Sequence, residues 1–127
     1  MAAPPDWTCP VARVARLLGD ATSLLLLRDL EAGPRRFGEL LGSAAGNTRL
    51  LSGRLRRLTE AGVLERRPVP GLPTRVAYAL SPMGRDLLPV LHDLRSFGER
   101  WLPALCDPLR PPLPEPLSTR PPGVGRA

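Results

Sequence analysis

The stretch that decides the fold is NTRLLSGRLRRLTEAG, residues 47–62. Leu51, Leu55 and Leu58 recur at i, i+4 and i+7, which is the spacing of one face of an α-helix. The other face carries hydrogen-bonding or basic side chains: Thr48, Arg49, Ser52, Arg56 and Thr59. We therefore expect a helix whose leucines enter a core and whose basic face stays open to solvent. Asn47 or Thr48 supplies its N-cap.

A shorter helical pattern precedes this stretch. In GPRRFGELL, residues 33–41, Phe37, Leu40 and Leu41 fall on one side, and Arg35 and Arg36 stand at the exposed start. Residues 42–46 include two glycines and predict a turn. Two short helices joined by such a turn, the second with a basic face, are typical of a helix-turn-helix.

The two adjacent arginines indicate a phosphate partner. Free N–H groups at a helix start carry partial positive charge, which disfavours a cation there by roughly 0.3–1 kcal/mol. A phosphate would accept bonds from those N–H groups and from both guanidinium forks at once. We expect Arg35 and Arg36 to position the protein on a nucleic acid backbone without reading base sequence.

Two helices are expected before this region. Residues 10–18 carry a stripe at helical spacing, formed by Val11, Val14, Ala15 and Leu18. Residues 21–32 are apolar around most of a helix circumference and predict a central buried helix, which Asp20 can cap.

A hairpin and a long helix are expected after it. Residues 63–69 and 75–80 are prone to form strands and are separated by PGLPT. In the second run, alternation predicts that Val76, Tyr78 and Leu80 pack while the other face stays free. A long helix then follows Ser81-Pro82, and Pro89 should bend it or delay its start.

The excess positive charge is confined to one segment. The 127 residues have a formal charge of +6, and all 18 basic residues are arginines. Residues 33–80 contain nine arginines and three acids, a net charge of +6, so the remainder of the chain is neutral. Such a segment is typical of a surface that meets a polyanion, although a solvated basic face has the same composition.

The sequence gives little support for a secreted protein, a membrane protein, a metalloprotein or an enzyme. Residues 1–8 lack the features of a secretory signal, and the apolar run 24–27 is far shorter than a membrane span, so we expect a cytoplasmic protein that does not bind membranes. Two cysteines and one histidine do not make a plausible zinc site, and we expect no cofactor or metal. We find no catalytic constellation and expect no enzyme.

The expected fold class is mainly α with a small β-hairpin, a winged helix-turn-helix over residues 9–107. Residues 1–8 form a flexible N-terminus in this prediction. Residues 108–127 contain many prolines and predict a disordered tail.

The order of elements and four strings resemble the HxlR-type winged helix-turn-helix transcriptional regulators. The strings are CPVARVARLLG at 9–19, LLLLRDLEAGPRRFGELL at 24–41, LSGRLRRLTEAGVLERR at 51–67 and PGLPTRVAYALSPMGRDLLPVL at 70–91. The resemblance implies a homodimer on double-stranded DNA, with helix 48–61 in the major groove and hairpin 63–80 as the wing. It places dimerisation on helices 10–18 and 84–104.

The chain departs from the family at a few positions. Asp20-Ala21-Thr22 follows Gly19, where the family commonly has a basic residue and a tryptophan. Asn47 stands at a usually apolar position, and Gly53 interrupts the recognition helix at a cost of about 1 kcal/mol relative to alanine. Base preference could therefore differ from that of relatives.

Residue roles follow from this interpretation. Groove contacts are expected from helix 48–61, and backbone or minor-groove contacts from the wing. The full set of candidate DNA-binding residues is Arg35, Arg36, Thr48, Arg49, Ser52, Arg56, Arg66, Arg67 and Arg75. Arg54 and Arg57 flank the apolar stripe and are expected to contact the DNA backbone or form internal ion pairs.

Cys9 is a candidate redox-sensing residue. It stands at a helix start, where the helix dipole favours a thiolate, and several members of the family sense oxidants through a cysteine here. The alternative is a small buried apolar side chain. A small-molecule or oxidant effector is a further candidate partner.

The sequence is compatible with two functions. The first is a sequence-specific transcriptional regulator, with repression the expected action. The second is a winged-helix protein-interaction module that has lost specific DNA binding, which Asn47 and Gly53 favour.

Overall fold

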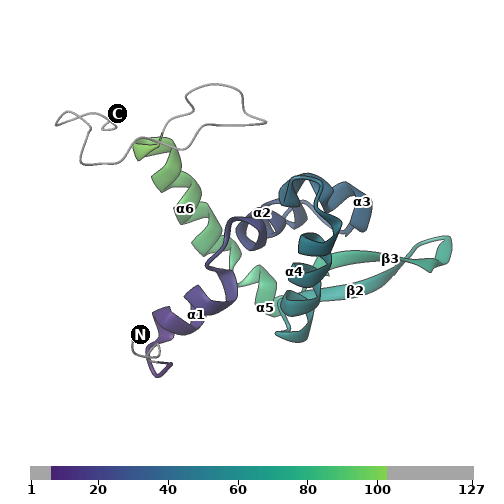
Figure 1. The fold of residues 1–127 in the computed structure, drawn as a ribbon, viewed down its shortest axis with the longest axis horizontal. Coiled ribbons are helices and arrows are strands. Elements are labelled where there is room, and N and C mark those ends of the chain that lie inside the picture. The colour runs from purple at the N-terminus through teal and green to yellow at the C-terminus, as the bar shows by residue number, and fades with distance from the viewer. Residues whose placement is uncertain (1–6, 103–127) are drawn as a thin grey trace. The chain divides into compact units, whose positions relative to one another are not determined.

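The computed structural model describes residues 7–102, and their elements are shown in Figure 1. Helix α1 (Pro10–Leu18) and helix α2 (Ala21–Leu30) confirm the two predicted N-terminal helices. Asp20 caps α2, since its side chain accepts a hydrogen bond from the backbone N of Ser23 at 2.8 Å. Helix α2 is central, with Leu26, Leu27 and Leu30 at most 2% exposed.

The helix-turn-helix is formed by helix α3 (Phe37–Leu40), the 3-10 helix η1 (Leu41–Ala44) and helix α4 (Thr48–Glu60). The predicted turn is thus partly helical, and it reverses through Ala45 and Gly46, both in the left-handed region at φ 53° and 78°. Asn47 supplies the N-cap of α4, because its side chain accepts from the backbone N of Leu50 at 3.0 Å.

The predicted hairpin is part of a three-stranded antiparallel sheet of order β1-β3-β2. Its strands are β1 (Arg35–Arg36), β2 (Leu64–Val69) and β3 (Leu72–Leu80). Strands β2 and β3 are joined at Pro70 and Gly71, where Gly71 takes φ 79°. The register shifts after Pro68, so residues 73–75 have no partner on β2.

One expectation about this hairpin was wrong. Ala77 and Ala79 were expected on a free face, but they are 7% and 2% exposed, whereas Val76 and Tyr78 are only partly buried. The reason is tertiary: β3 is the central strand between β1 and β2, and α2, α3 and α5 also contact it. Small alanine side chains allow such elements to approach closely.

The predicted long helix is interrupted near Pro89. Helix α5 (Pro82–Arg85) is capped by Ser81, whose Oγ accepts from the backbone N of Gly84 at 3.1 Å, and helix α6 (Leu88–Trp101) follows. The chain divides into two compact units between Leu88 and Pro89. No helix among residues 7–102 has the length and apolarity needed to cross a membrane.

Candidate nucleic-acid interface

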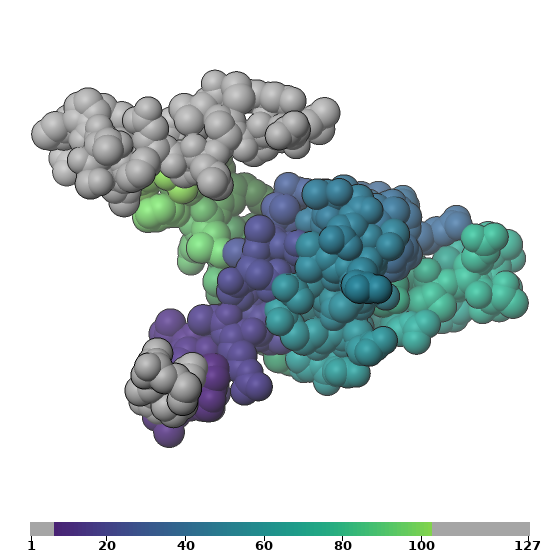
Figure 2. All heavy atoms as spheres, in the orientation of Figure 1, coloured from purple at the N-terminus to yellow at the C-terminus, as the bar shows by residue number. Residues whose placement is uncertain are grey.

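Helix α4 presents two chemically distinct faces. Leu51, Leu55 and Leu58 are at most 1% exposed, as their spacing predicted. Four side chains on the other face are exposed: Thr48, Arg49, Ser52 and Arg56. Figure 2 shows the atoms of α4 on the face turned to the viewer, with the hairpin beside them. The helix therefore has a solvated, hydrogen-bonding surface free to meet a partner.

The register of the three strands decides which face of the sheet each arginine of β1 and β2 lies on. Tyr78 on β3 pairs with Arg35 on β1 and with Arg66 on β2, so these three residues form one row on the same face of the sheet. Arg36 and Arg67 pair with Ala77 and form the next row, on the opposite face. Sequence neighbours Arg35 and Arg36 therefore point to opposite faces.

Arg35 and Arg36 stand at the start of α3, as predicted, but the register directs their side chains to opposite faces, which disfavours a joint grip on one phosphate. Both residues form strand β1, and Arg36 is also the N-cap of α3. The backbone N of Arg36 donates to Glu39 Oε1 at 2.9 Å, and the Arg35 guanidinium lies 3.8 Å from the same carboxylate. Glu39 thus places one negative charge beside these arginines, and a phosphate contact of either arginine stays a prediction.

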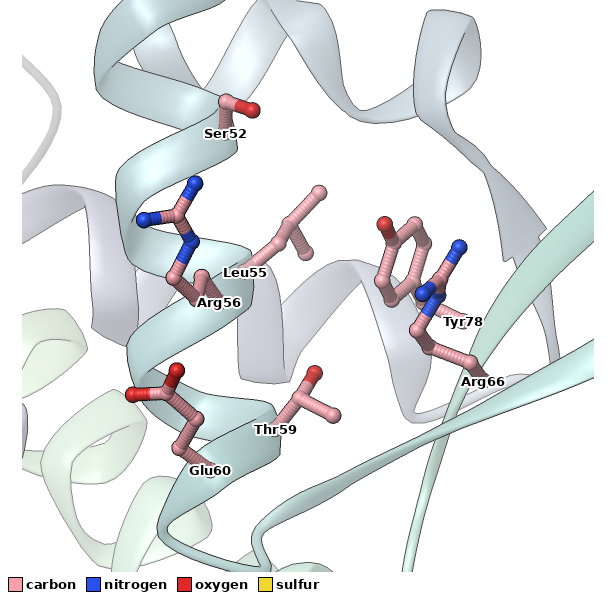
Figure 3. Close-up of a pocket in the computed structure, with 7 residues that line it drawn as sticks. All are labelled: Ser52, Leu55, Arg56, Thr59, Glu60, Arg66 and Tyr78. Carbon is pink, nitrogen blue, oxygen red and sulfur yellow. The ribbon is translucent and has the colours of Figure 1, made fainter.

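A groove of about 330 Å³ separates α4 from the hairpin (Figure 3). Its lining consists of Ser52, Leu55, Arg56, Thr59, Glu60, Arg66 and Tyr78. Figure 3 shows the Tyr78 hydroxyl directed toward α4, with Arg66 beside its ring. The Thr59 Oγ1 is buried and has no hydrogen-bond partner among the described residues. Ser52 and Arg56 supply hydrogen-bond donors from α4, and Arg66 and Tyr78 supply them from the sheet.

Four residues that line this groove were missing from the predicted site: Leu55, Thr59, Glu60 and Tyr78. Tyr78 was assigned to packing, and Glu60 was given no role. Tyr78 reaches the groove only because β3 lies in the centre of the sheet, and no local pattern reports that position. Glu60 follows Arg56 by four residues, a spacing that could have drawn attention to it, although the two do not form an ion pair.

A second hollow continues along the exposed face of α4. It is lined by Phe37, Thr48, Arg49, Ser52, Gly53 and Arg56, so it shares Ser52 and Arg56 with the first groove. Nothing within 4 Å would meet a Cβ added at Gly53. Arg49, Arg56 and Arg66 are therefore brought to two adjoining hollows by the fold.

The nine arginines of the basic segment fall into two groups. Four form ion pairs within the described chain: Arg35 with Glu39, Arg67 with Glu65, and both Arg54 and Arg57 with Asp20. The internal pairing expected as one option for Arg54 and Arg57 is confirmed. The other five make no ion pair with residues 7–102 and are exposed: Arg36, Arg49, Arg56, Arg66 and Arg75.

Cys9 is a half-buried free thiol at the N-cap position of α1. Its side chain makes no capping hydrogen bond. Among residues 7–102, no group of three or more metal-binding side chains is close enough to hold a metal ion.

A family model described as HxlR-like helix-turn-helix matches residues 17–105. The chain belongs to this family. It is 41% identical over 95 residues to the HTH-type transcriptional regulator sll1512 of Synechocystis, covering 74% of this chain and 70% of that protein. Relatives and fold are those of HxlR-like transcriptional regulators and not of enzymes, so the chain is a winged-helix transcriptional regulator.

Solved structures agree with this membership. The putative transcription factor PA1607 matches with a TM-score of 0.70 and 36% identity, covering 90% of this chain and 79% of that one. The redox regulator HypR in its reduced form matches with a TM-score of 0.65 and 27% identity, covering 72% of this chain and 91% of that one.

Proposed function

We propose that this HxlR-like regulator is a homodimeric repressor that binds operator DNA in a sequence-specific manner. Helix α4 enters the major groove, and the β2–β3 hairpin acts as a wing on the backbone or minor groove. Two copies then contact half-sites about one helical turn apart, or a multiple of that spacing.

The observation that carries this proposal is the pair of adjoining hollows along α4. They gather Arg49, Arg56 and Arg66, none of which forms an ion pair with another described residue. Uncompensated guanidinium groups on one surface attract a polyanion, and they release condensed counterions when they meet DNA phosphates.

The candidate residues divide by role in this proposal. Thr48, Arg49, Ser52 and Arg56 face the bases, where an arginine can grip O6 and N7 of guanine. The remaining candidates position the backbone: Arg35, Arg36, Arg66, Arg67 and Arg75. Arg35 and Arg67 do so less strongly, because acids at 3.8 Å and 2.9 Å partly neutralise them.

Exposed apolar side chains support dimerisation. On α1, Val11 is 74% exposed and Val14 47% exposed. On α6, Val90, Leu94 and Phe97 are also exposed. Apolar stripes of this kind on helices mark surfaces that bind another protein, and a second copy is the partner proposed here.

The test is a selection of bound genomic fragments followed by titration against salt. A dimer that makes about eight phosphate contacts should give a log–log slope of affinity on salt near −7. A reporter fused to the selected operator should be silenced. If the folded dimer binds no fragment at any salt concentration, the alternative of a protein-interaction module replaces this proposal.

A second proposal concerns Cys9, a free thiol at the start of α1 in a chain similar to a redox regulator. A hydroperoxide would oxidise Cys9 to the sulfenic acid and be reduced to an alcohol. Oxidant should then weaken operator binding by the wild type and leave Cys9→Ser unaffected. Equal responses of the two proteins would exclude this role.

A further inference from the structure

The side chain of Asp20 links helices α2 and α4. Its Oδ1 accepts from the backbone N of Ser23 at 2.8 Å, and its Oδ2 accepts from the Ser23 hydroxyl at 2.9 Å, so one part of its role is to cap α2. The same carboxylate also accepts from two arginines of α4. Arg54 Nε donates to Oδ1 at 3.2 Å, and Arg57 Nη2 donates to Oδ2 at 2.7 Å.

Arg57 extends this link to α1. Its Nη2 donates to the backbone carbonyl of Leu17, near the end of α1, at 3.1 Å. Asp20 and Arg57 together join the end of α1, the start of α2 and the second half of α4. In the proposed function, α1 belongs to the dimer surface and α4 reads the DNA.

We propose that Asp20 is a positioning residue for DNA recognition, which holds α4 through Arg54 and Arg57 at the angle required for operator binding. This inference rests on the proposed function. Asp20 does not touch DNA in it and acts only through the two arginines.

The hydrogen bonds to Asp20 add a directional constraint to the apolar packing of α4. Burial of Leu51, Leu55 and Leu58 stabilises packing but is non-directional. Charge-assisted hydrogen bonds, in contrast, constrain distance and angle together. A small tilt of α4 would displace side chains along its whole exposed face.

The contribution of this link to overall stability is expected to be modest. The side chains of Asp20, Arg54 and Arg57 are 27%, 30% and 40% exposed, so solvent screens their attraction. Loss of the link should therefore change recognition while leaving the protein folded.

Asp20 has a second effect, because it neutralises two arginines of the basic segment. Removal of its charge would release Arg54 and Arg57 to meet phosphates of any sequence. Each added phosphate contact steepens the log–log salt slope by about 0.9. The substitution should thus weaken specific binding and strengthen non-specific binding.

The substitution Asp20→Ser isolates the link, because serine is as good an N-cap as aspartate and can still serve α2. The matched control is Asp86→Ser, which removes the same charge from an exposed position that forms no ion pair within residues 7–102. Thermal unfolding and circular dichroism establish that both variants are folded at the assay temperature.

The readout is the ratio of affinities for the selected operator and for random DNA. For Asp20→Ser we expect at least about a tenfold loss on the operator, which corresponds to the lower range for one base contact. Affinity for random DNA should rise, with a salt slope steeper by up to about 1.8. Asp86→Ser should change both affinities by the same factor.

Arg57→Gln provides an independent variant that leaves the Asp20 cap intact. Arg57→Gln should lose affinity for the operator. It should not gain affinity for random DNA, because the Arg57 guanidinium that would contact additional phosphates has been removed. In this background, the further change Asp20→Ser should have a smaller effect on the operator than it has alone.

The outcomes separate this inference from the function on which it rests. If the wild type binds no operator, the proposed function fails. If the wild type binds and the ratio for folded Asp20→Ser equals that of Asp86→Ser, the positioning role is wrong. If Asp20→Ser does not fold, Arg57→Gln takes its place in the test. An operator-to-random affinity ratio equal to that of the wild type for Arg57→Gln would then show that the positioning role is wrong.

Discussion

At the scale of single residues, Gly53 and Gly84 form an instructive pair. Both lie in helices, but a Cβ at Gly53 would meet nothing within 4 Å, whereas one at Gly84 would collide with the carbonyl oxygen of Val63 and approach Leu80 Cβ to 3.3 Å. The first glycine is therefore dispensable for the fold, and the second allows α5 to lie against the end of the sheet.

Gly53→Ala should stabilise the protein by about 1 kcal/mol, because alanine loses less conformational entropy in a helix. This corresponds to a rise in Tm of roughly 4–8 °C for a domain of this size. Gly84→Ala should lower Tm. Thermal unfolding of both variants checks the pair, and a fall in Tm for Gly53→Ala would contradict the open space around this position.

The pH dependence of stability provides a second prediction at this scale. Partial burial alone would raise the pKa of Asp20, but hydrogen bonds from Ser23 and Arg54, with the charge of Arg54, hold that pKa below its ordinary value. A carboxylate with a lowered pKa stabilises the folded state above its unfolded pKa of about 3.9, and this contribution disappears as pH falls through the folded pKa.

Urea unfolding of wild type and Asp20→Ser should measure this effect. The difference in unfolding free energy should stay constant above about pH 5 and shrink as pH falls below 4. A difference that remained unchanged down to pH 2 would contradict an ionised Asp20 in the folded protein.

At the scale of elements, α4 and the hairpin are expected to contribute differently to DNA binding. Arg49→Ala on α4 should change the preference among operators by about 1–3 kcal/mol. Arg75→Ala, in the stretch of β3 without partners on β2, should weaken all sequences alike and reduce the salt slope by about 0.9.

The comparison needs a control for net charge. Arg85→Ala on α5 removes one exposed arginine outside the basic segment and should leave the salt slope nearly unchanged. Competition titrations with an operator library check all three variants. If Arg49→Ala and Arg75→Ala weakened every sequence by one common factor, the division between reading and positioning would be abandoned.

At the scale of the whole molecule, the proposed function requires two copies of the chain to assemble before operator DNA is bound. Val11→Glu places a charge in the exposed apolar stripe of α1, where dimerisation would bury it at high cost. We expect light scattering to show monomers and operator affinity to fall by several orders of magnitude, since two half-sites need two copies. Leu72→Glu, which changes a 49% exposed leucine of the hairpin, should remain dimeric.

Much of the architecture was predictable from local patterns. The leucine stripe of α4, its Asn47 cap and the helical spacing of α1 and α2 each depend on residues within one or two turns, so a sequence window contains the relevant physics. The confinement of excess charge to residues 33–80 was likewise visible, and with the family resemblance it pointed to the regulator class.

The details of the interface depended on contacts between distant residues. Strand β1 exists only because Arg35 and Arg36 pair with Tyr78 and Ala77 more than forty residues later, and that register sends the two arginines to opposite faces. Asp20 likewise meets Arg57 37 residues along the chain.

The sequence by itself determined which segments form helices and where positive charge accumulates, because periodicity, capping and composition are local properties. Only the tertiary structure decided which arginines remain available to a partner. That outcome depends on which acids the fold brings within a few ångströms of each guanidinium, and distances between remote residues are set by packing of the whole chain.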